Sequence, residues 1–336
     1  MASIPLAARP EAHPHLRPLN ILRDLPAVAD LIELCFSDTM DREGQRYVQD
    51  MRRAGQDDNF LNWATRMAES TSLPLTGYVW EEDGKLVGNA SLVPFRHKGQ
   101  RTYLIANVAV HPNYRRHGIA RTLTERTLKH ASDRRITSIW LHVRDDNPGA
   151  IKLYSDLGFQ ERARRTAWQT RGAGSSQYSP SGITITDRIA QHWPQQEEWL
   201  RRNYPDSLAW YRPWNFSGLR PGIWSSLQRM FVGISVRQWS ALSGTERRLE
   251  AALAWFPSGG ETTGLLLAAG PNPRLDAVTG LLLHARRALA YNPNLSLDYP
   301  AGEAEDAFRA AGFENLRTLI WMQYTGATSR PVNRML

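Results

Sequence analysis

The stretch Val108-Ala-Val-His-Pro-Asn-Tyr-Arg-Arg-His-Gly-Ile-Ala120 decides the fold of this 336-residue chain. It opens inside the apolar, β-branched run Ile105–Val110, which predicts a buried strand. A basic turn follows, and we expect a helix to begin at Arg115. The first turn of a helix leaves main-chain N–H groups unpaired at its positive end, so this turn predicts a phosphate site. Gly118 and Ala120 are small enough to let a diphosphate approach the main chain.

A second segment, Asn147-Pro-Gly-Ala-Ile-Lys-Leu-Tyr-Ser-Asp-Leu-Gly-Phe159, follows further along the chain. Together the two segments resemble the GNAT superfamily of acyl-CoA-dependent N-acetyltransferases. The family signature Gln/Arg-x-x-Gly-x-Gly/Ala corresponds to Arg115–Ala120. The family pattern Asn-x-x-Ala-x-x-x-Tyr-x-x-x-Gly-Phe corresponds to Asn147–Phe159. The resemblance covers about residues 15 to 170, and two ordered motifs are more specific than either alone.

Acetyl-CoA is the cosubstrate that the resemblance implies. Arginine side chains around the turn supply charge-assisted donors to its phosphates, and the pantetheine arm is expected to pair with main-chain groups of the strand. The implied cofactor-binding residues are Val108, Ala109, Val110, Arg115, Arg116, His117, Gly118, Ile119, Ala120, Arg121 and Asn147. Asn147 has a second interpretation, because Asn before Pro148 also suits the N-cap of a helix.

Two catalytic roles follow from the resemblance. Tyr154 occupies the family's tyrosine position and is the implied general acid that protonates the CoA sulfur. Ordinary aromatic packing on a helix is the alternative. The main-chain N–H of Val108 is the implied donor to the thioester carbonyl oxygen.

The general base departs from the family pattern. Relatives that modify histones place a glutamate on the fourth strand, and the corresponding residue here is Leu104, which cannot accept a proton. Glu81, Glu82 and His142 are the other candidates, acting directly or through water, and each also fits a structural or solvent-facing role. His111 and His117 flank the turn and are interpreted as phosphate neighbours or surface residues.

The first half predicts a mixed α/β sheet flanked by helices. Asp83-Gly84 indicates a hairpin between two of its strands. The expected strands are Leu16–Leu19, Leu75–Glu82, Lys85–Pro94, Thr102–Val110, Ile136–Val143 and Glu161–Thr170, and the expected helices are Asp24–Phe36, Glu43–Ala54, Asn59–Glu69, Arg115–Ala131 and Gly149–Leu157.

The second half repeats this order without the phosphate signature, which predicts a degenerate second GNAT-like unit. Its turn reads Gly270-Pro-Asn-Pro-Arg-Leu-Asp-Ala-Val-Thr279, so we expect no CoA there. An unrelated α/β domain is the alternative. The expected elements are Ile183–Ile185, Gln195–Arg202, Glu250–Trp255, Thr262–Ala269, Asp276–Ala290, Leu295–Tyr299, Glu303–Gly312 and Leu316–Tyr324. Seven tryptophans from Trp193 to Trp255 fit either a core or an acceptor pocket.

The length favours two domains. We predict a catalytic GNAT domain over residues 15–171, a linker rich in Gly, Ser and Gln over 172–181, and a degenerate GNAT-like domain over 182–326. The single cysteine, Cys35, lies in an apolar helical run and is expected to be a buried thiol rather than part of a disulfide.

The net charge of +8 is compatible with nucleic-acid binding, but no nucleic-acid module is recognised and a CoA site also needs positive charge. No apolar run is long enough to span a membrane, and the first residues do not resemble a signal peptide. We therefore expect a cytoplasmic monomer or homodimer without a metal site.

The sequence thus predicts an N-acetyltransferase that carries an acetyl group from acetyl-CoA to a primary amine of a small molecule or peptide. A non-catalytic acyl-CoA sensor is the first alternative, because Leu104 replaces the expected carboxylate. An enzyme that modifies a protein or ribosomal substrate is the second, with the basic surface guiding an acidic partner.

Overall fold

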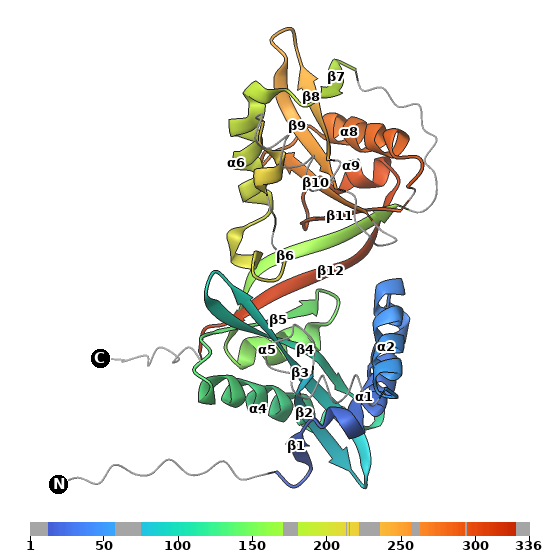
Figure 1. Ribbon diagram of the computed structural model, residues 1–336, viewed down its shortest axis with the longest axis vertical. Coiled ribbons are helices and arrows are strands. Elements are labelled where there is room, and N and C mark those ends of the chain that lie inside the picture. Colours follow the sequence, from blue (N-terminus) through green and yellow to red (C-terminus); the bar gives the residue numbers. More distant parts are fainter. Residues whose placement is uncertain are drawn as a thin grey trace, which may run out of the picture. The chain divides into compact units, whose positions relative to one another are not determined.

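Two compact units make up the chain, shown in Figure 1. The computed structural model describes residues 13–57, 75–170, 181–212, 214, 216–221, 236–256, 263–292 and 294–326. Unit 1 comprises residues 1–142, 149–160 and 322–336, and unit 2 comprises residues 143–148 and 161–321. The predicted helix Asn59–Glu69, most of the predicted linker and Trp224 lie outside the described residues.

Unit 1 is built on a mixed sheet. Strands β1 to β4 pair antiparallel in chain order, and β4 pairs parallel with β5. The elements are β1 (Leu16–Pro18), α1 (Ile21–Phe36), α2 (Arg42–Ala54), β2 (Thr76–Glu82), β3 (Lys85–His97), β4 (Gln100–Val110), α4 (Ile119–Asp133), β5 (Ser138–Arg144) and α5 (Pro148–Asp156). The predicted mixed α/β class is confirmed.

Local sequence signals set the boundaries of these elements. The Asn20 side chain accepts the Leu22 N–H at the start of α1, and the Asp41 side chain accepts the Gly44 N–H at the start of α2. Asp83 and Gly84 have φ angles of 48° and 75°, as the tight β2–β3 hairpin turn requires. The hairpin prediction is therefore confirmed.

The two faces of this sheet carry different helices. Successive residues of β2 point to opposite faces, so Val79 packs with the helices α1 and α2 while its neighbours Tyr78 and Trp80 pack with Ile119 and Leu123 of α4. Figure 1 shows α4 on one side of β2–β4 and α1 with α2 on the other. A molecule bound at the α4 start and one bound beside α2 would therefore reach β4 from opposite faces.

Unit 2 repeats the element order of unit 1. Its strand order is β12-β6-β11-β10-β9-β8-β7. The elements are β6 (Phe159–Thr170), β7 (Ile183–Asp187), α6 (Trp193–Asn203), β8 (Arg237–Ser243), β9 (Arg248–Trp255), β10 (Thr263–Ala269), α8 (Leu275–Ala288), β11 (Leu295–Pro300), α9 (Glu305–Ala310) and β12 (Phe313–Tyr324). The repeat of strands and helices supports the predicted second GNAT-like unit.

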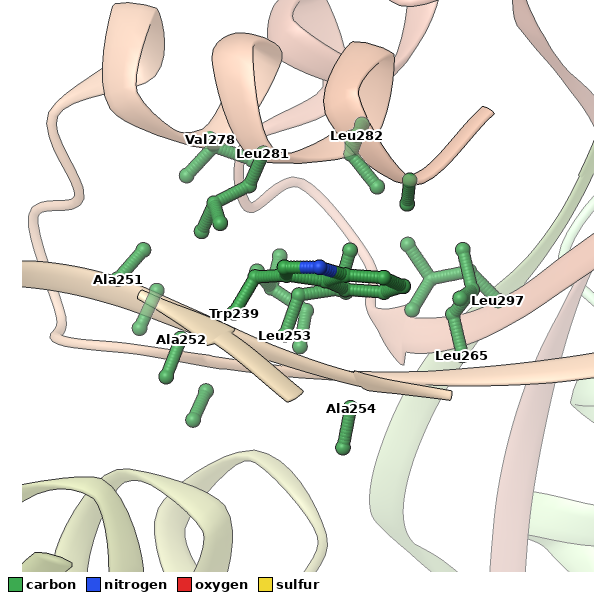
Figure 2. Close-up of a cluster of buried hydrophobic side chains, with 14 of the residues drawn as sticks. Trp239, Ala251, Ala252, Leu253, Ala254, Leu265, Val278, Leu281, Leu282 and Leu297 are labelled. Atoms are coloured by element: carbon green, nitrogen blue, oxygen red, sulfur yellow. The ribbon is translucent and has the colours of Figure 1, made fainter. Parts of the chain in front are cut away.

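The core of unit 2 is built around large aromatic rings and small neighbours. Figure 2 shows Trp239 beneath Val278, Leu281 and Leu282 of α8. Alanines on β9 and β10 leave room for such rings in a close-packed interior. Trp193, Trp239 and Trp255 are buried, and Trp199 and Trp214 pack against the same core. These five tryptophans fill the core, as the first of the two sequence interpretations expects.

Several element boundaries differ from the predictions. The helix expected from Arg115 begins only at Ile119, because Arg116 and Gly118 adopt left-handed φ angles of 68° and 80° that break a helix. Strand β8 was not predicted at all. Four consecutive residues, Trp239–Leu242, are buried, so this strand lacks the alternation of a half-buried strand.

The two units are interleaved along the chain rather than consecutive. The sequence assigns β6 to the end of the first domain, but its residues from Glu161 onward belong to unit 2, where Arg165–Gln169 pair antiparallel with β11 and Gln169 lies opposite Ser296. The end of β12 is in turn grouped with unit 1, where Tyr324 packs on Phe159 and the Thr325 N–H donates to the Gly158 carbonyl oxygen at 3.1 Å. The predicted boundaries therefore do not coincide with these compact units, because a strand's pairing partner is not encoded in its own residues.

Replacing Leu253 with alanine should lower the free energy of unfolding by about 2–5 kcal/mol, because this fully buried side chain leaves a cavity beside Trp239. Urea unfolding followed by tryptophan fluorescence measures the change. Leu275→Ala is the matched control, since Leu275 is 44% exposed, and it should change stability by no more than about 0.5 kcal/mol. Equal losses in both variants would contradict the assigned core.

Candidate functional site

A bulge interrupts β4 at Asn107. The β3–β4 register runs from Asn89 opposite Ala109 to Ser91 opposite Ala106, so Asn107 and Val108 together face the single residue Ala90. Asn107 has a φ of 53°, in the left-handed region that asparagine tolerates better than most residues. The strand therefore bends next to Val108, whose N–H is the donor to the thioester that the family resemblance implies.

Buried and half-buried amides hold this bulge. Asn89 is fully buried, and its Nδ2 donates to the Asn107 carbonyl oxygen at 2.8 Å. That carbonyl thus points toward β3. Because the peptide bond is trans, the N–H of Val108 in the same peptide unit points the opposite way, toward the β5 side of the strand.

Strands β4 and β5 pair only over a short distance. Their parallel pairing runs from Thr102 opposite Ser138 to Ile105 opposite Leu141 and goes no further in the described part of the chain. The β5-facing edge of β4 from Ala106 to Val110 is consequently unpaired by β5. An extended ligand arm can hydrogen-bond to an edge of this kind.

The turn after β4 ends in a helix start with free donors. The Thr122 N–H is the first to bond within α4, to the Gly118 carbonyl oxygen at 3.0 Å. No main-chain partner is found among the described residues for the N–H groups of Ile119, Ala120 and Arg121. Ile119 is buried and anchors the turn to the sheet. A Cβ at Gly118 would meet nothing within 4 Å, so its φ of 80° is the reason for glycine there.

Positive side chains surround these donors. Arg115, Arg116 and His117 are exposed, and the Arg115 Nε donates to the Val110 carbonyl oxygen at 3.2 Å. Arg121 lies 3.6 Å from Asp156 of α5. No ion pair to Arg115 or Arg116 occurs within the described ranges, although Arg115 also interacts with the Cys35 thiol, so neither positive charge is neutralised by a carboxylate there.

His111 has a structural role in the same turn. Its Nδ1 accepts the Asn113 N–H at 3.3 Å, and its ring meets Tyr114 edge to face. The Cys35 thiol donates to the Val110 carbonyl oxygen at 3.3 Å and is half-buried rather than fully buried as expected. Burial raises the pKa of Cys35, which keeps the thiol protonated.

Tyr154 lies on α5 with its ring buried against Phe159. Burial raises the pKa of the Tyr154 hydroxyl, so it stays protonated at neutral pH and can act only as a donor there. Its hydroxyl makes no hydrogen bond within the described residues. Asn147 occupies the turn between β5 and α5 and is exposed.

The carboxylate candidates are engaged elsewhere or replaced, and His142 is the candidate that follows the last β4–β5 pair. Leu104 is buried inside β4. Glu81 accepts from Arg17 and Arg23, and the hydrogen bond from Arg17 lowers the Glu81 pKa, which makes this carboxylate a weaker base. Glu82 accepts the Trp80 Nε1–H at 2.9 Å. His142 follows directly on the last paired residue of β5. Across the described residues, no group of His, Cys, Asp and Glu could hold a metal ion.

A polar pair beside the bulge was not predicted. Nδ2 of Asn107 donates to Oη of Tyr47 on α2 at 2.7 Å. One signal was available, since Asn107 is a lone polar residue inside the apolar run of β4. Its partner could not be found from the sequence, because Tyr47 lies 60 residues earlier in the chain.

Comparison with known proteins assigns this arrangement to a family. The model of the Acetyltransferase (GNAT) family matches residues 28–159, which include the bulge, the basic turn and Tyr154. This segment is 132 of the chain's 336 residues, so the match describes the first half of the chain. The resemblance predicted from the two motifs is therefore confirmed.

Curated GNAT relatives match only part of the chain. [Ribosomal protein bS18]-alanine N-acetyltransferase of Escherichia coli (strain K12) is 42% identical over 59 residues, which are 18% of this chain and 40% of that protein. Mycothiol acetyltransferase of Catenulispora acidiphila is 39% identical over 62 residues, which are 18% of this chain and 20% of that protein. The matched segment thus spans less than half the length of these relatives.

The fold of the whole chain also occurs in a solved GNAT structure. The crystal structure of a GCN5-related N-acetyltransferase from Sphaerobacter thermophilus has a TM-score of 0.53 at 14% identity. The alignment covers 93% of this chain and 96% of that one, so it includes both halves. None of the described helices is long and apolar enough to cross a membrane.

In unit 2 a parallel strand pair, β10 and β11, also separates after a few residues, but side chains bond to the main-chain groups beyond that point. Parallel pairing of β10 with β11 ends at Leu265 opposite Leu297. Beyond that point the Leu267 N–H donates to Oη of Tyr204 at 2.9 Å, and the Ala269 N–H donates to Oδ1 of Asn203 at 3.1 Å. These donors are therefore already paired within unit 2, and the absence of CoA there stays a prediction.

Tyr204→Phe should lower the free energy of unfolding by about 1–3 kcal/mol, because the buried Leu267 N–H loses its acceptor. Chemical denaturation measures the loss. The control is Tyr291→Phe, which removes the same hydroxyl from a residue that is 65% exposed and should leave stability unchanged. An unchanged denaturation midpoint for Tyr204→Phe would show that the hydrogen bond between Leu267 and Tyr204 contributes nothing to stability.

Proposed function

We propose that unit 1 transfers an acetyl group from acetyl-CoA to a primary amine, with both substrates bound at the same time. The observation that carries this proposal is the set of unpaired N–H groups at the start of α4, next to the unpaired edge of β4. The family's acetyltransferases supply the reaction class. The first half thus combines a diphosphate site with a track for an extended arm.

The residues present fit acetyl-CoA. The N–H groups of residues 119–121 and the guanidinium groups of Arg115 and Arg116 match the charge and acceptor pattern of its phosphates. Main-chain groups on the β5-facing edge from Ala106 to Val110 match the amide groups of the pantetheine arm, apart from the Asn107 and Val110 carbonyls, which are bonded to Asn89 and to Cys35 and Arg115. His117 is exposed in the turn before α4 and is assigned to the same substrate, and Asn147, exposed between β5 and α5, is assigned to it from the family pattern alone.

Two groups then act on the reacting atoms. The Val108 N–H, turned toward the β5 side by the bulge, donates to the thioester carbonyl oxygen as that oxygen gains charge. Tyr154 gives its proton to the departing sulfur and is reprotonated by solvent. Because burial raises the Tyr154 pKa, the required proton is present throughout the neutral range.

A non-catalytic acyl-CoA sensor is the second candidate. Leu104 at the expected carboxylate position favours it, since a leucine cannot remove a proton from an ammonium acceptor. Acetylation of a protein or ribosomal substrate is a variant of the first candidate. The names of the curated relatives and the net charge of +8 support it. Location in the cytoplasm and a monomeric or dimeric state belong to the proposal as well.

Tyr154→Phe should lower kcat by about 100-fold, because the sulfur loses its proton donor, and should leave the Kd for acetyl-CoA within about threefold. CoA-thiol release across a panel of amines measures kcat, and titration calorimetry measures Kd. Tyr291→Phe serves as the control for hydroxyl loss elsewhere. Thiol release that is absent from the unmodified protein with every amine would favour the sensor.

Gly118→Asp should weaken acetyl-CoA binding by at least about 10-fold, because a carboxylate would face the diphosphate at the helix start. Gly99→Asp is a matched control. Gly99 has a φ of 79°, close to the 80° of Gly118, and a Cβ at either position meets nothing within 4 Å. The control introduces the same strain and charge at the β3–β4 hairpin. Equal binding by both variants would refute the phosphate site.

A further inference from the structure

Tyr47 and Asn107 form an uncharged pair on the α2 side of the β4 bulge. The Asn107 side chain reaches Tyr47 of α2, whereas the next residue, Val108, packs with the cluster that contains Ile119 of α4. These contacts are on opposite faces of the sheet, because α2 packs with Val79 and α4 packs with Tyr78 and Trp80. The pair therefore lies across the sheet from the helix start proposed to hold the diphosphate, on the face from which an acceptor can approach.

Within the described residues, the pair has one hydrogen-bond donor and one acceptor without a partner, the Tyr47 hydroxyl proton and Oδ1 of Asn107. Oη of Tyr47 accepts from Nδ2 of Asn107, so the Tyr47 proton points elsewhere, and no acceptor for it occurs among the described residues. Oδ1 of Asn107 also has no donor there. Burial raises the pKa of Tyr47 to about 12, so its hydroxyl is a proton donor and not a base at neutral pH.

No carboxylate is bonded to this pair in the described part of the chain. Glu81 and Glu82 are engaged with Arg17, Arg23 and Trp80. Among the described residues, an ammonium acceptor would thus find no carboxylate bonded to the pair that could deprotonate it. Only the neutral amine has the lone pair that attacks the thioester, so the acceptor must react as its free base, with the Asn107 amide oxygen accepting its N–H.

The requirement for an uncharged amine favours acceptors whose amine has a low pKa. Peptide α-amino groups have pKa values of roughly 7.7–8.0, and lysine side chains have values of roughly 10.4. At pH 7.5, roughly a third of the former is uncharged, compared with roughly a thousandth of the latter. A peptide α-amino group also has a carbonyl oxygen beside it, which can accept the spare proton of a tyrosine.

We propose that Tyr47 and Asn107 are the acceptor subsite, and that they bind a peptide α-amino group as its free base. This inference rests on the proposed acetyl transfer. Asn107 Oδ1 accepts an N–H of the amine, and the Tyr47 hydroxyl donates to the neighbouring carbonyl oxygen. The nitrogen lone pair forms the C–N bond as the C–S bond breaks. The nitrogen releases one proton to solvent, and the sulfur takes one from Tyr154.

The pH dependence of kcat/KM tests the form of the acceptor that binds. With an alanyl peptide, kcat/KM should rise tenfold per pH unit at low pH and level off near the pKa of that peptide's amine. With Nα-acetyl-lysine amide it should still be rising at pH 9. A fixed pKa near 6.5 with both acceptors, abolished in His142→Gln, would overturn the inference, because it would identify an enzyme base.

Two substitutions test the residues themselves. Tyr47→Phe should raise KM for the alanyl peptide by about 10-fold or more, while kcat and the Kd for acetyl-CoA change by less than about threefold. Asn107→Asp keeps a residue that tolerates the left-handed φ and adds a carboxylate, so it should raise the rate with the lysine acceptor relative to the peptide by about 10-fold. Unchanged KM in the first variant, or an unchanged ratio in the second, would overturn the inference.

Controls separate this inference from the proposed function. Tyr291→Phe should behave as the unmodified protein in every assay. A melting curve that shows Tyr47→Phe to be folded is required before its KM is interpreted. If the unmodified protein binds acetyl-CoA and releases no thiol with either acceptor, the acetyl transfer itself fails. If thiol is released from both acceptors with equal kcat/KM at pH 7.5, only the subsite fails.

Discussion

The left-handed conformation of Asn107 is the constraint on which the rest of unit 1 depends. A non-glycine residue in this region costs about 1–2 kcal/mol, and two hydrogen bonds to its carbonyl and amide groups, from Asn89 and to Tyr47, offset that cost. The bend turns the Val108 N–H away from β3. The same residue therefore links the packing of α2, the register of β3 and the direction of the main-chain donor.

The partners of main-chain N–H groups differ between the two units at the place where their parallel strands separate. Each has a parallel strand pair that parts after a few residues, and each therefore exposes main-chain N–H groups that need partners. In unit 2 the partners are Tyr204 and Asn203, which belong to the fold itself. In unit 1, no side chain among the described residues accepts from the N–H groups of the corresponding β4 edge. Similar topology thus gives a closed unit in one half and an open one in the other.

Local motifs were readable from the sequence, whereas long-range partners were not. The basic turn, Gly118 and the Asp83-Gly84 hairpin are determined within a few residues, so their spacing was sufficient. The helix start near Arg115 was predicted too early because the left-handed φ of Arg116 has no sequence signature. The Tyr47–Asn107 bond and the pairing of β6 with β11 join distant segments, and no local pattern encodes them.

The interleaving of the two units has a consequence for synthesis on the ribosome. Tyr324 and Thr325, which pack on the segment just after Tyr154, are made only after all of unit 2 has been translated. Unit 1 therefore lacks its last segment, which begins at Met322, while most of its chain has already left the ribosome. For the same reason, cutting the gene midway would leave each product short of residues that complete it.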